Sequence, residues 1–504
     1  MREFWPAMDE KRRLPRNVIA NVVQVLASAG LLFALYRYIN VTLGVEQLGI
    51  WSVVLATASA SRLADLGLSA GVTRFVARDR ARGDLARAGQ VVDTALLMLM
   101  VVVGAALPLL YPLIAGLLPH LFDVEHLTGA LEILPYALAS LWLTIVAAVF
   151  QGGLDGCQRM DLRAGLVVAG QIAMLASAIV LVPRFGLVGL AWAQIGQGLL
   201  LVIGGRAALR RALPPLPRLP RQWSRPVLRE MLGYGTNVQV ATVFMLLLDP
   251  VAKALMARFG GPAAAGYFEM ANQVLLRVRA LIVSANQAIV PHVAALAATE
   301  PARLTHLYRD NMHLLVFVTL PAFALLIAWA GGFSWLLIGA YQPEFVFLIT
   351  LLSVAWGANI FAGPAYFTNL GTGQVGWNTL SHMLMGALNA ALGWLLGVRY
   401  GANGVAFGYA IALIAGSAML IGVYGYRHRV RCRAGLTQGH LPLIAASLTV
   451  AVFGWLMPLR KEADEPALAL IGLLVPLLVL GASVWYHPVR RRLFESWSAR
   501  RVRI

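Results

Sequence analysis

Residues 184–200 read RFGLVGLAWAQIGQGLL, and residues 399–415 read RYGANGVAFGYAIALIA. Glycines and apolar residues coincide when the second segment is shifted back by 215 positions. Two shorter matches have nearly the same spacing: LGIW (48–51) with AGYF (265–268) at 217, and GLDGCQ (153–158) with LGTGQ (370–374) at 216. Self-similarity at one period predicts that the chain is an internal duplication.

The composition indicates a membrane protein. Of the 504 residues, 59% are hydrophobic and 13% are charged, whereas soluble domains have roughly 25% charged residues. Apolar runs of about 20 residues, enough for a helix to cross a hydrocarbon layer of about 30 Å, recur along the chain. We therefore predict an all-α polytopic fold. The fourteen predicted spans are 17–41, 48–72, 91–118, 131–152, 164–183, 186–208, 232–257, 264–294, 312–332, 344–369, 378–398, 402–425, 440–458 and 466–486.

The positive charges predict the orientation of these spans. Of the 41 lysines and arginines, 31 lie in the tails and short loops on one side and five lie on the other side. The positive-inside rule then places both termini in the cytoplasm. Because the net charge of +18 comes from these loops, we expect no nucleic-acid partner. The two cysteines fall on the same predicted side, so we expect neither a disulfide framework nor a metal site.

The duplication predicts the domain organisation. Each repeat holds six spans, so both copies enter the membrane in the same direction, and parallel repeats of this kind enclose a substrate path between them. The predicted parts are an N-terminal lobe (1–212), a basic proline-rich cytoplasmic linker (213–230), a C-terminal lobe (231–433), and two extra spans with a basic cytoplasmic tail (434–504). The linker is interpreted either as a strap on the anionic inner leaflet or as a solvated connection.

Cations inside the spans are the main candidates for a binding site. A charged side chain at the bilayer centre costs about 2.5–3.5 kcal/mol on insertion scales, and arginine suits phosphate because its planar fork donates two hydrogen bonds. Five cations lie inside predicted spans, all of them in spans one, two, seven and eight, which correspond in the two repeats. The predicted cavity cations are Arg37, Arg62, Lys253, Arg277 and Arg279.

Three carboxylates accompany these cations. Asp65 lies three residues after Arg62, and Asp249 lies four residues before Lys253, so each pair shares a helical face. Each pair is interpreted either as a functional site or as mutual neutralisation, because a buried ion pair is weak evidence for function. Together with Glu269, Asp65 and Asp249 are candidates for binding a coupling ion.

The N-terminal sequence resembles a known family. An LG dipeptide (43–44) and LGIW (48–51) form a short outer turn, and DLGL (65–68) is followed by Arg74 at the inner end of span two. This pattern, with the duplication and two extra spans, resembles the polysaccharide-exporter branch, which includes O-antigen and exopolysaccharide flippases, of the MATE-like flippase superfamily. The resemblance implies a V-shaped pair of lobes that alternate between inward-open and outward-open states.

The same resemblance implies the activity. The expected cargo is a lipid-linked oligosaccharide on undecaprenyl pyrophosphate, moved to the outer leaflet of a bacterial inner membrane for O-antigen, capsule or exopolysaccharide synthesis. We expect no cofactor and no enzymatic activity; H⁺, Na⁺ or the membrane potential are the alternative energy sources. We expect a monomer, with polysaccharide polymerase machinery as a candidate partner. The alternatives are a cation-coupled multidrug exporter or a membrane glycan polymerase or ligase, although the short outer loops disfavour the latter.

Overall fold

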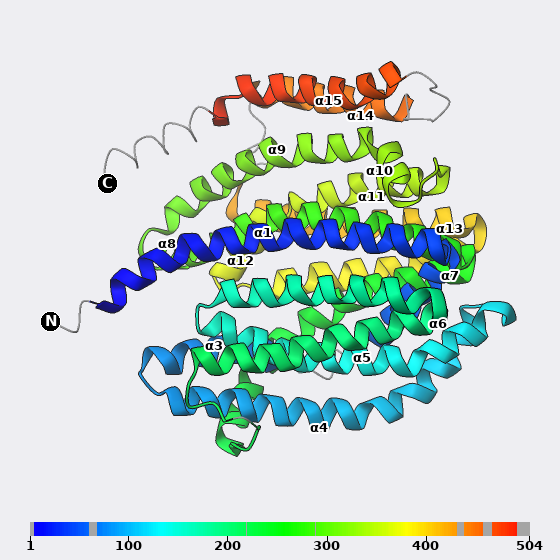
Figure 1. Ribbon diagram of the computed structural model, residues 1–504. Coiled ribbons are helices and arrows are strands. Elements are labelled where there is room, and N and C mark those ends of the chain that lie inside the picture. The colour runs from blue at the N-terminus through cyan, green and yellow to red at the C-terminus, as the bar shows by residue number, and fades with distance from the viewer. Residues whose placement is uncertain are drawn as a thin grey trace. The chain divides into compact units, whose positions relative to one another are not determined.

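The computed structural model describes residues 5–59, 68–217, 219–287, 289–430, 438–456 and 466–490. These residues form α-helices, short 3-10 turns and connecting segments, with no strand among them (Figure 1). The α-helices are α1 (Trp5–Thr42), α2 (Val45–Ala58), α3 (Leu68–Ala81), α4 (Leu85–Leu117), α5 (Val124–Gly156), α6 (Met160–Ala212), α7 (Arg225–Gln287), α8 (Val290–Thr299), α9 (Leu304–Ala328), α10 (Ala330–Leu337), α11 (Pro343–Ile360), α12 (Gly363–Gly371), α13 (Gly376–His428), α14 (Leu441–Leu456) and α15 (Pro466–Tyr486).

The helices have the lengths and composition of membrane spans. In the described part of the chain, seven helical segments are long and apolar enough to cross a membrane, and three shorter apolar helices accompany them. Two of the seven, α6 and α13, have 53 residues each, or about 80 Å at 1.5 Å per residue. Each of these two helices therefore contains two of the predicted spans. The predicted all-α, multi-pass architecture is confirmed.

Glycines interrupt the long helices at matching places in the two repeats. Gly186 breaks α6 with φ 54° and ψ −133°, and Gly401 breaks α13 with φ 61° and ψ −145°. Positive φ is strained for residues with a Cβ atom, which explains the glycine at both positions. The second pair, Gly44 before α2 and Gly261 within α7, has φ values of 87° and 77°. The duplication read from the sequence is thus repeated in the backbone.

Each break in α6 and α13 reverses the chain into a tight hairpin. A Cβ atom on Gly189 would lie 2.5 Å from the carbonyl oxygen of Leu181, and one on Gly404 would lie 2.0 Å from that of Leu396. Gly189 and Leu181 in the first repeat thus correspond to Gly404 and Leu396 in the second repeat at a shift of 215. The two antiparallel arms can approach this closely only because these positions lack side chains.

One predicted match needs a correction. The sequence aligned Gln158 with Gln374, a shift of 216. In the structure the positive-φ residues are Gln158 (56°) and Gly373 (77°), and the next residues, Arg159 and Gln374, donate their N–H groups to the carbonyl oxygens of Leu154 and Asn369. The backbone shift is therefore 215. The sequence alignment was one position off because it matched the two glutamine side chains.

The helices form two compact units, Met1–Gly266 and Tyr267–Ile504. In the first unit, α5 packs against α2, α3, α4 and α6, and α1 packs against α6. In the second unit, α11 packs against α9 and α13, and α14 packs against α9 and α15. The division between the units falls within α7. The boundaries predicted from the sequence, 1–212, 213–230, 231–433 and 434–504, stay predictions.

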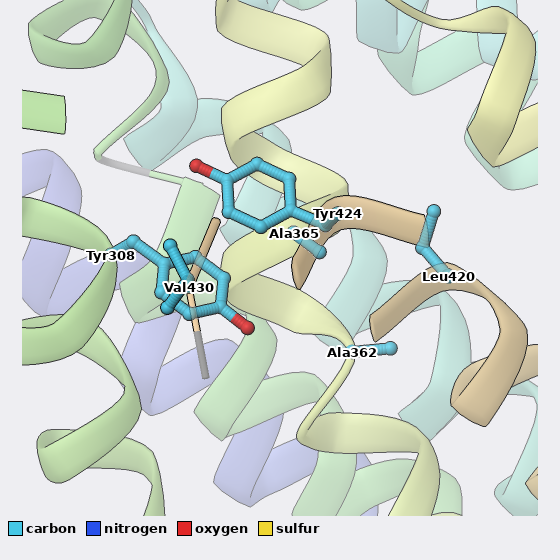
Figure 2. Packing of buried hydrophobic residues seen from close by; sticks show 6 residues of the cluster. All are labelled: Tyr308, Ala362, Ala365, Leu420, Tyr424 and Val430. Atoms are coloured by element: carbon cyan, nitrogen blue, oxygen red, sulfur yellow. The ribbon is translucent and has the colours of Figure 1, made fainter. Parts of the chain in front are cut away.

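Aromatic packing closes one end of the second unit. The rings of Tyr308 on α9 and Tyr424 on α13 stack with centroids 4.5 Å apart and an interplanar angle of 15°. Ala362, Ala365, Leu420 and Val430 complete the buried cluster with them (Figure 2). Small and aromatic side chains pack together here, so α9, α12 and α13 approach closely near their ends.

Candidate functional site

The predicted cavity cations of the first unit lie on α1 and α7. Arg37 is half-buried on α1, and its Nη1 atom is buried without a hydrogen-bond partner among the described residues. Lys253 on α7 is 9% exposed, and Asp249 is half-buried one turn before it. The helix α7 continues through Pro250 and is interrupted at Gly261.

Arg62 and Asp65 lie outside the described residues. The geometry predicted for this pair, on one helical face of span two, stays a prediction.

The second unit contains the other predicted site residues, all on α7. Glu269 is 5% exposed, and its Oε1 atom accepts a hydrogen bond from Gln273 Nε2 at 3.1 Å. Arg277 is half-buried, and its Nε atom has no hydrogen-bond partner within the described part of the chain. Arg279 places its guanidinium carbon 4.9 Å from the centroid of the Trp356 ring.

The aromatic ring beside Arg279 is itself held by a hydrogen bond. Trp356 on α11 is 6% exposed, and its Nε1 atom donates to Asn272 Oδ1 at 2.9 Å. Elsewhere in this unit, Tyr366 and His382 pack edge to face with centroids 5.8 Å apart. Sequence reasoning missed Trp356, because a single aromatic residue in an apolar run has no distinguishing pattern.

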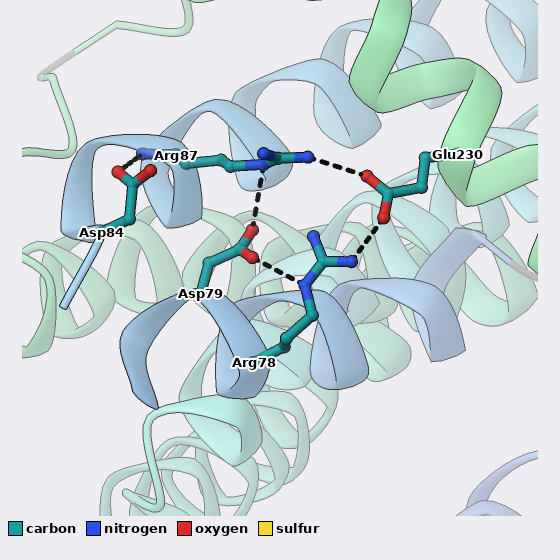
Figure 3. A network of polar contacts seen from close by, with 5 residues as sticks. All are labelled: Arg78, Asp79, Asp84, Arg87 and Glu230. Carbon is teal, nitrogen blue, oxygen red and sulfur yellow. Dashed lines mark hydrogen bonds and ion pairs between the residues drawn. The ribbon is translucent and has the colours of Figure 1, made fainter. Parts of the chain in front are cut away.

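A network of charges, also missed from the sequence, joins α3, α4 and the start of α7 (Figure 3). Asp79 is buried, with a side chain 1% exposed, and lies at the end of α3. Arg78 Nε donates to Asp79 Oδ1 at 2.7 Å, and Arg87 Nε lies 3.6 Å from Asp79 Oδ2. The buried carboxylate therefore contacts the same atom, Nε, of both guanidinium groups.

Both arginines also bind a second carboxylate. Arg78 Nη1 donates to Glu230 Oε1, and Arg87 Nη2 donates to Glu230 Oε2 at 3.0 Å. Asp84 fixes the start of α4, because its Oδ1 atom accepts from the Arg87 backbone N–H at 2.9 Å and caps the helix. Two arginines from two helices thus converge on one carboxylate at the start of a third helix.

The pKa values in this network follow from these contacts. Hydrogen bonds to Asp79 and Glu230 raise the pKa of Arg78 above its ordinary value. The hydrogen bond from Arg78 lowers the pKa of Glu230. Both groups therefore stay charged over a wide pH range, and the four side chains together carry no net charge.

A second network holds the linker that follows α6. Asp93 on α4 is fully buried; Arg206 donates to its Oδ1 atom at 3.2 and 3.3 Å. Its Oδ2 atom accepts the backbone N–H groups of Arg221 (3.1 Å) and Gln222 (3.3 Å). Thr94 adds two bonds, donating to the Gln222 carbonyl and accepting from the backbone N–H of Ser224. At these residues, the linker is bound to the protein rather than freely solvated.

Three histidines form a hydrogen-bonded row at one end of α9, α14 and α15. His440 Nε2 lies 2.8 Å from His313 Nδ1, and His440 Nδ1 lies 2.8 Å from His487 Nε2. The Val489 backbone N–H donates to His487 Nδ1, so the neutral imidazole of His487 has its proton on Nε2. His487 then donates to His440, and His440 donates to His313. Among the described residues, no group of three His, Cys, Asp or Glu side chains is arranged to hold a metal ion.

The sequence matches one family and no curated protein. The sequence profile of a family described as "Polysaccharide biosynthesis protein" matches residues 14–297. No curated protein matches the sequence.

Solved structures share the fold over 80–94% of the chain. The lipid II flippase MurJ in an inward closed conformation is similar over 94% of this chain and 99% of its own, with a TM-score of 0.70 and 13% identity. A multidrug resistance MATE family transporter of the MOP superfamily, in an inward-facing conformation, is similar over 80% and 94%, with a TM-score of 0.67 and 18% identity. The Vibrio cholerae MATE transporter VcmN in its bent form is similar over 83% and 97%, with a TM-score of 0.57 and 17% identity. Identities this low establish the fold alone.

Proposed function

Because the chain belongs to the polysaccharide biosynthesis protein family, we propose that it is a flippase for a lipid-linked oligosaccharide carried on undecaprenyl pyrophosphate. It would take the cargo from the inner leaflet and release it in the outer leaflet by alternating access. The family match carries this proposal, and the buried cations of the membrane helices support it. The product would serve O-antigen, capsule or exopolysaccharide synthesis.

The cations suit the chemistry of this cargo. The lipid tail can stay in the bilayer, but the diphosphate and the sugars must cross an apolar layer. A buried lysine such as Lys253 and a half-buried arginine such as Arg277 replace part of the hydration that the diphosphate loses. We propose that the cargo binds to Arg37, Arg62, Lys253, Arg277 and Arg279.

Energy for transport has two candidate sources. The cell interior is negative, so moving an anion outward is favoured by about 2.3 kcal/mol per charge per 100 mV. Asp65, Asp249 and Glu269 are the candidate sites for an H⁺ or Na⁺ that returns inward. A resident cofactor is not required by either source.

The proposed setting is the bacterial inner membrane, with both chain termini in the cytoplasm. The protein would act as a monomer beside polysaccharide polymerase machinery. We propose transport without catalysis, since the cargo changes leaflet while its bonds stay intact.

The likeness to MATE transporters favours a second candidate, a cation-coupled multidrug exporter. The two candidates predict opposite phenotypes. Deleting the gene should abolish the surface polymer and leave lipid-linked units in the inner leaflet if the protein is the proposed flippase. Unchanged glycans with new drug sensitivity would instead support the exporter.

Complementation tests the role of the cations. Arg277→Ala should fail to restore polymer at normal protein levels, because the buried cation is lost. Arg399→Gln is the control, because this arginine is exposed at the end of a predicted span. Normal polymer with Arg277→Ala would remove Arg277 from the proposed site.

A further inference from the structure

The two carboxylates of the network in Figure 3 differ in how easily they can leave. The Asp79 side chain is 1% exposed, whereas the Glu230 side chain is 36% exposed. An unpaired buried carboxylate costs several kcal/mol, so Asp79 must keep its arginines. Glu230 can exchange its contacts for water or for another anion at a much smaller cost.

The terminal guanidinium nitrogens of both arginines are the atoms that could bind another anion in place of Glu230. Asp79 holds Arg78 through Nε at 2.7 Å and lies 3.6 Å from Arg87 Nε. The terminal nitrogens, Nη1 of Arg78 and Nη2 of Arg87, bind Glu230. Asp79 therefore orients the two forks, and Glu230 occupies the place toward which both point.

Glu230 leaves one donor at this place without an acceptor. Arg78 Nη2 is buried and has no hydrogen-bond partner in the described part of the chain. A carboxylate offers two oxygens, whereas a terminal phosphate offers three, and arginine binds phosphate with two parallel hydrogen bonds. A phosphate that displaced Glu230 would bring an acceptor for the remaining donor.

The position of the network suits cargo entry. Arg78 lies in the last turn of α3 and Arg87 in the first turn of α4, on the side predicted to face the cytoplasm. Glu230 lies in the second turn of α7, which is the first helix of the second repeat. Displacing Glu230 would release this part of α7 from α3 and α4. The linker would stay attached, because Asp93 holds the backbone N–H groups of Arg221 and Gln222.

We propose that Arg78 and Arg87 form the entry site for the diphosphate of the lipid-linked cargo, and that Glu230 is a placeholder that the cargo displaces. This inference rests on the proposed function. Binding at the entry site then favours release of α7, and by linkage an α7 that is already released binds the diphosphate more tightly. An ordinary phospholipid headgroup carries the same phosphate chemistry and is the alternative source of the anion.

Binding of undecaprenyl pyrophosphate to the purified protein in nanodiscs of zwitterionic lipid tests the site. Glu230→Gln should tighten binding about tenfold, because it keeps the shape and removes the competing charge. Arg78→Gln and Arg87→Gln should each weaken binding at least tenfold. Arg303→Gln is the matched control: Arg303 pairs with Glu300 at 2.8 Å in the second repeat, where its side chain is 67% exposed, so binding should not change.

Misfolding cannot imitate the expected result, since Glu230→Gln gains affinity. Spin labels at the exposed positions Arg82 and Arg229 add a second measurement: the distance between them should increase when undecaprenyl pyrophosphate is added. The inference is overturned if Glu230→Gln binds no more tightly than the wild type, or if the label distance stays fixed. It is also overturned if phosphatidylglycerol competes as well as the diphosphate, because the site would then bind headgroups.

The inference and the proposed function fail in different ways. Normal surface glycans in a deletion strain would contradict the flippase itself. A glycan defect combined with diphosphate binding that ignores Glu230 would contradict only the entry site.

Discussion

Replacing Asp93 with alanine should release the linker from the first unit. The substitution removes the acceptor for Arg206 and for two backbone N–H groups of the linker, all within 3.3 Å. Removing one partner of a buried charge pair costs about 3–5 kcal/mol. The Arg206 side chain is 13% exposed, so it can recover part of its hydration, and we take the lower value.

The opened linker becomes a protease substrate. A loss of about 3 kcal/mol in the free energy of local opening corresponds to a roughly 100-fold larger open population. Trypsin cleavage after Arg221 should accelerate by that factor when opening is fast relative to cleavage. The measurement is the rate of appearance of the two fragments from protein in micelles, followed on a gel.

Two variants calibrate this result. Thr94→Val removes two neutral hydrogen bonds to the linker, worth about 1 kcal/mol each, and should accelerate cleavage about 30-fold. Asp84→Ala removes the cap of the same helix and should leave cleavage unchanged. If Asp93→Ala accelerates cleavage less than threefold while the protein stays folded, the carboxylate does not hold the linker and the reasoning is refuted.

Three further predictions concern the second unit. Burial and two neighbouring histidines lower the pKa of His440 from 6.5 to about 4, so the folded state keeps this imidazole neutral while the unfolded state takes up a proton. The melting temperature should therefore fall as the pH decreases from about 6.5 to 4, and it should fall less in His440→Gln. His120→Gln, at an exposed histidine, is the control and should melt like the wild type. Gly404→Ala should destabilise the protein by about 1–3 kcal/mol, because the added Cβ would lie 2.0 Å from a carbonyl oxygen. Gly422→Ala is the control, because a Cβ there meets nothing within 4 Å. Equal melting temperatures for the two variants would contradict the close approach at Gly404. Arg279→Lys keeps the charge but loses the planar guanidinium that lies over the Trp356 ring, so polymer export should decrease at unchanged protein level. Full export would show that charge alone suffices.

The sequence predicted the fold well because the fold depends on local patterns. Apolar runs of the right length indicate spans, and the shift of 215 residues predicted that Gly186 and Gly401 would have equivalent places. Their dihedral angles agree within about 12°. The family resemblance, drawn from short motifs near the N-terminus and from the duplication, is confirmed by the profile match.

The polar networks could not be predicted in the same way. Glu230 meets Arg78 across 152 residues of sequence, and Asp93 meets Arg206 across 113. In the sequence these are ordinary charges at the ends of apolar runs, where the positive-inside rule already explains the arginines. Only the packing of α3, α4 and α7 shows which carboxylate each arginine contacts. The roles of Arg37, Lys253 and Arg277 stay predictions.

The two repeats have kept the same backbone breaks and have diverged in their charges. In the sequence, Glu300 and Arg303 lie 216 positions after Asp84 and Arg87 and have the same spacing. In the first repeat the acid caps α4, which leaves the Arg87 side chain to reach Glu230. In the second repeat Arg303 binds its own neighbour Glu300 and is largely exposed. Among the described residues, Arg87 thus contacts a carboxylate on another helix, whereas Arg303 contacts a carboxylate three residues away. This contrast is why we place the proposed diphosphate entry site at α3 and α4.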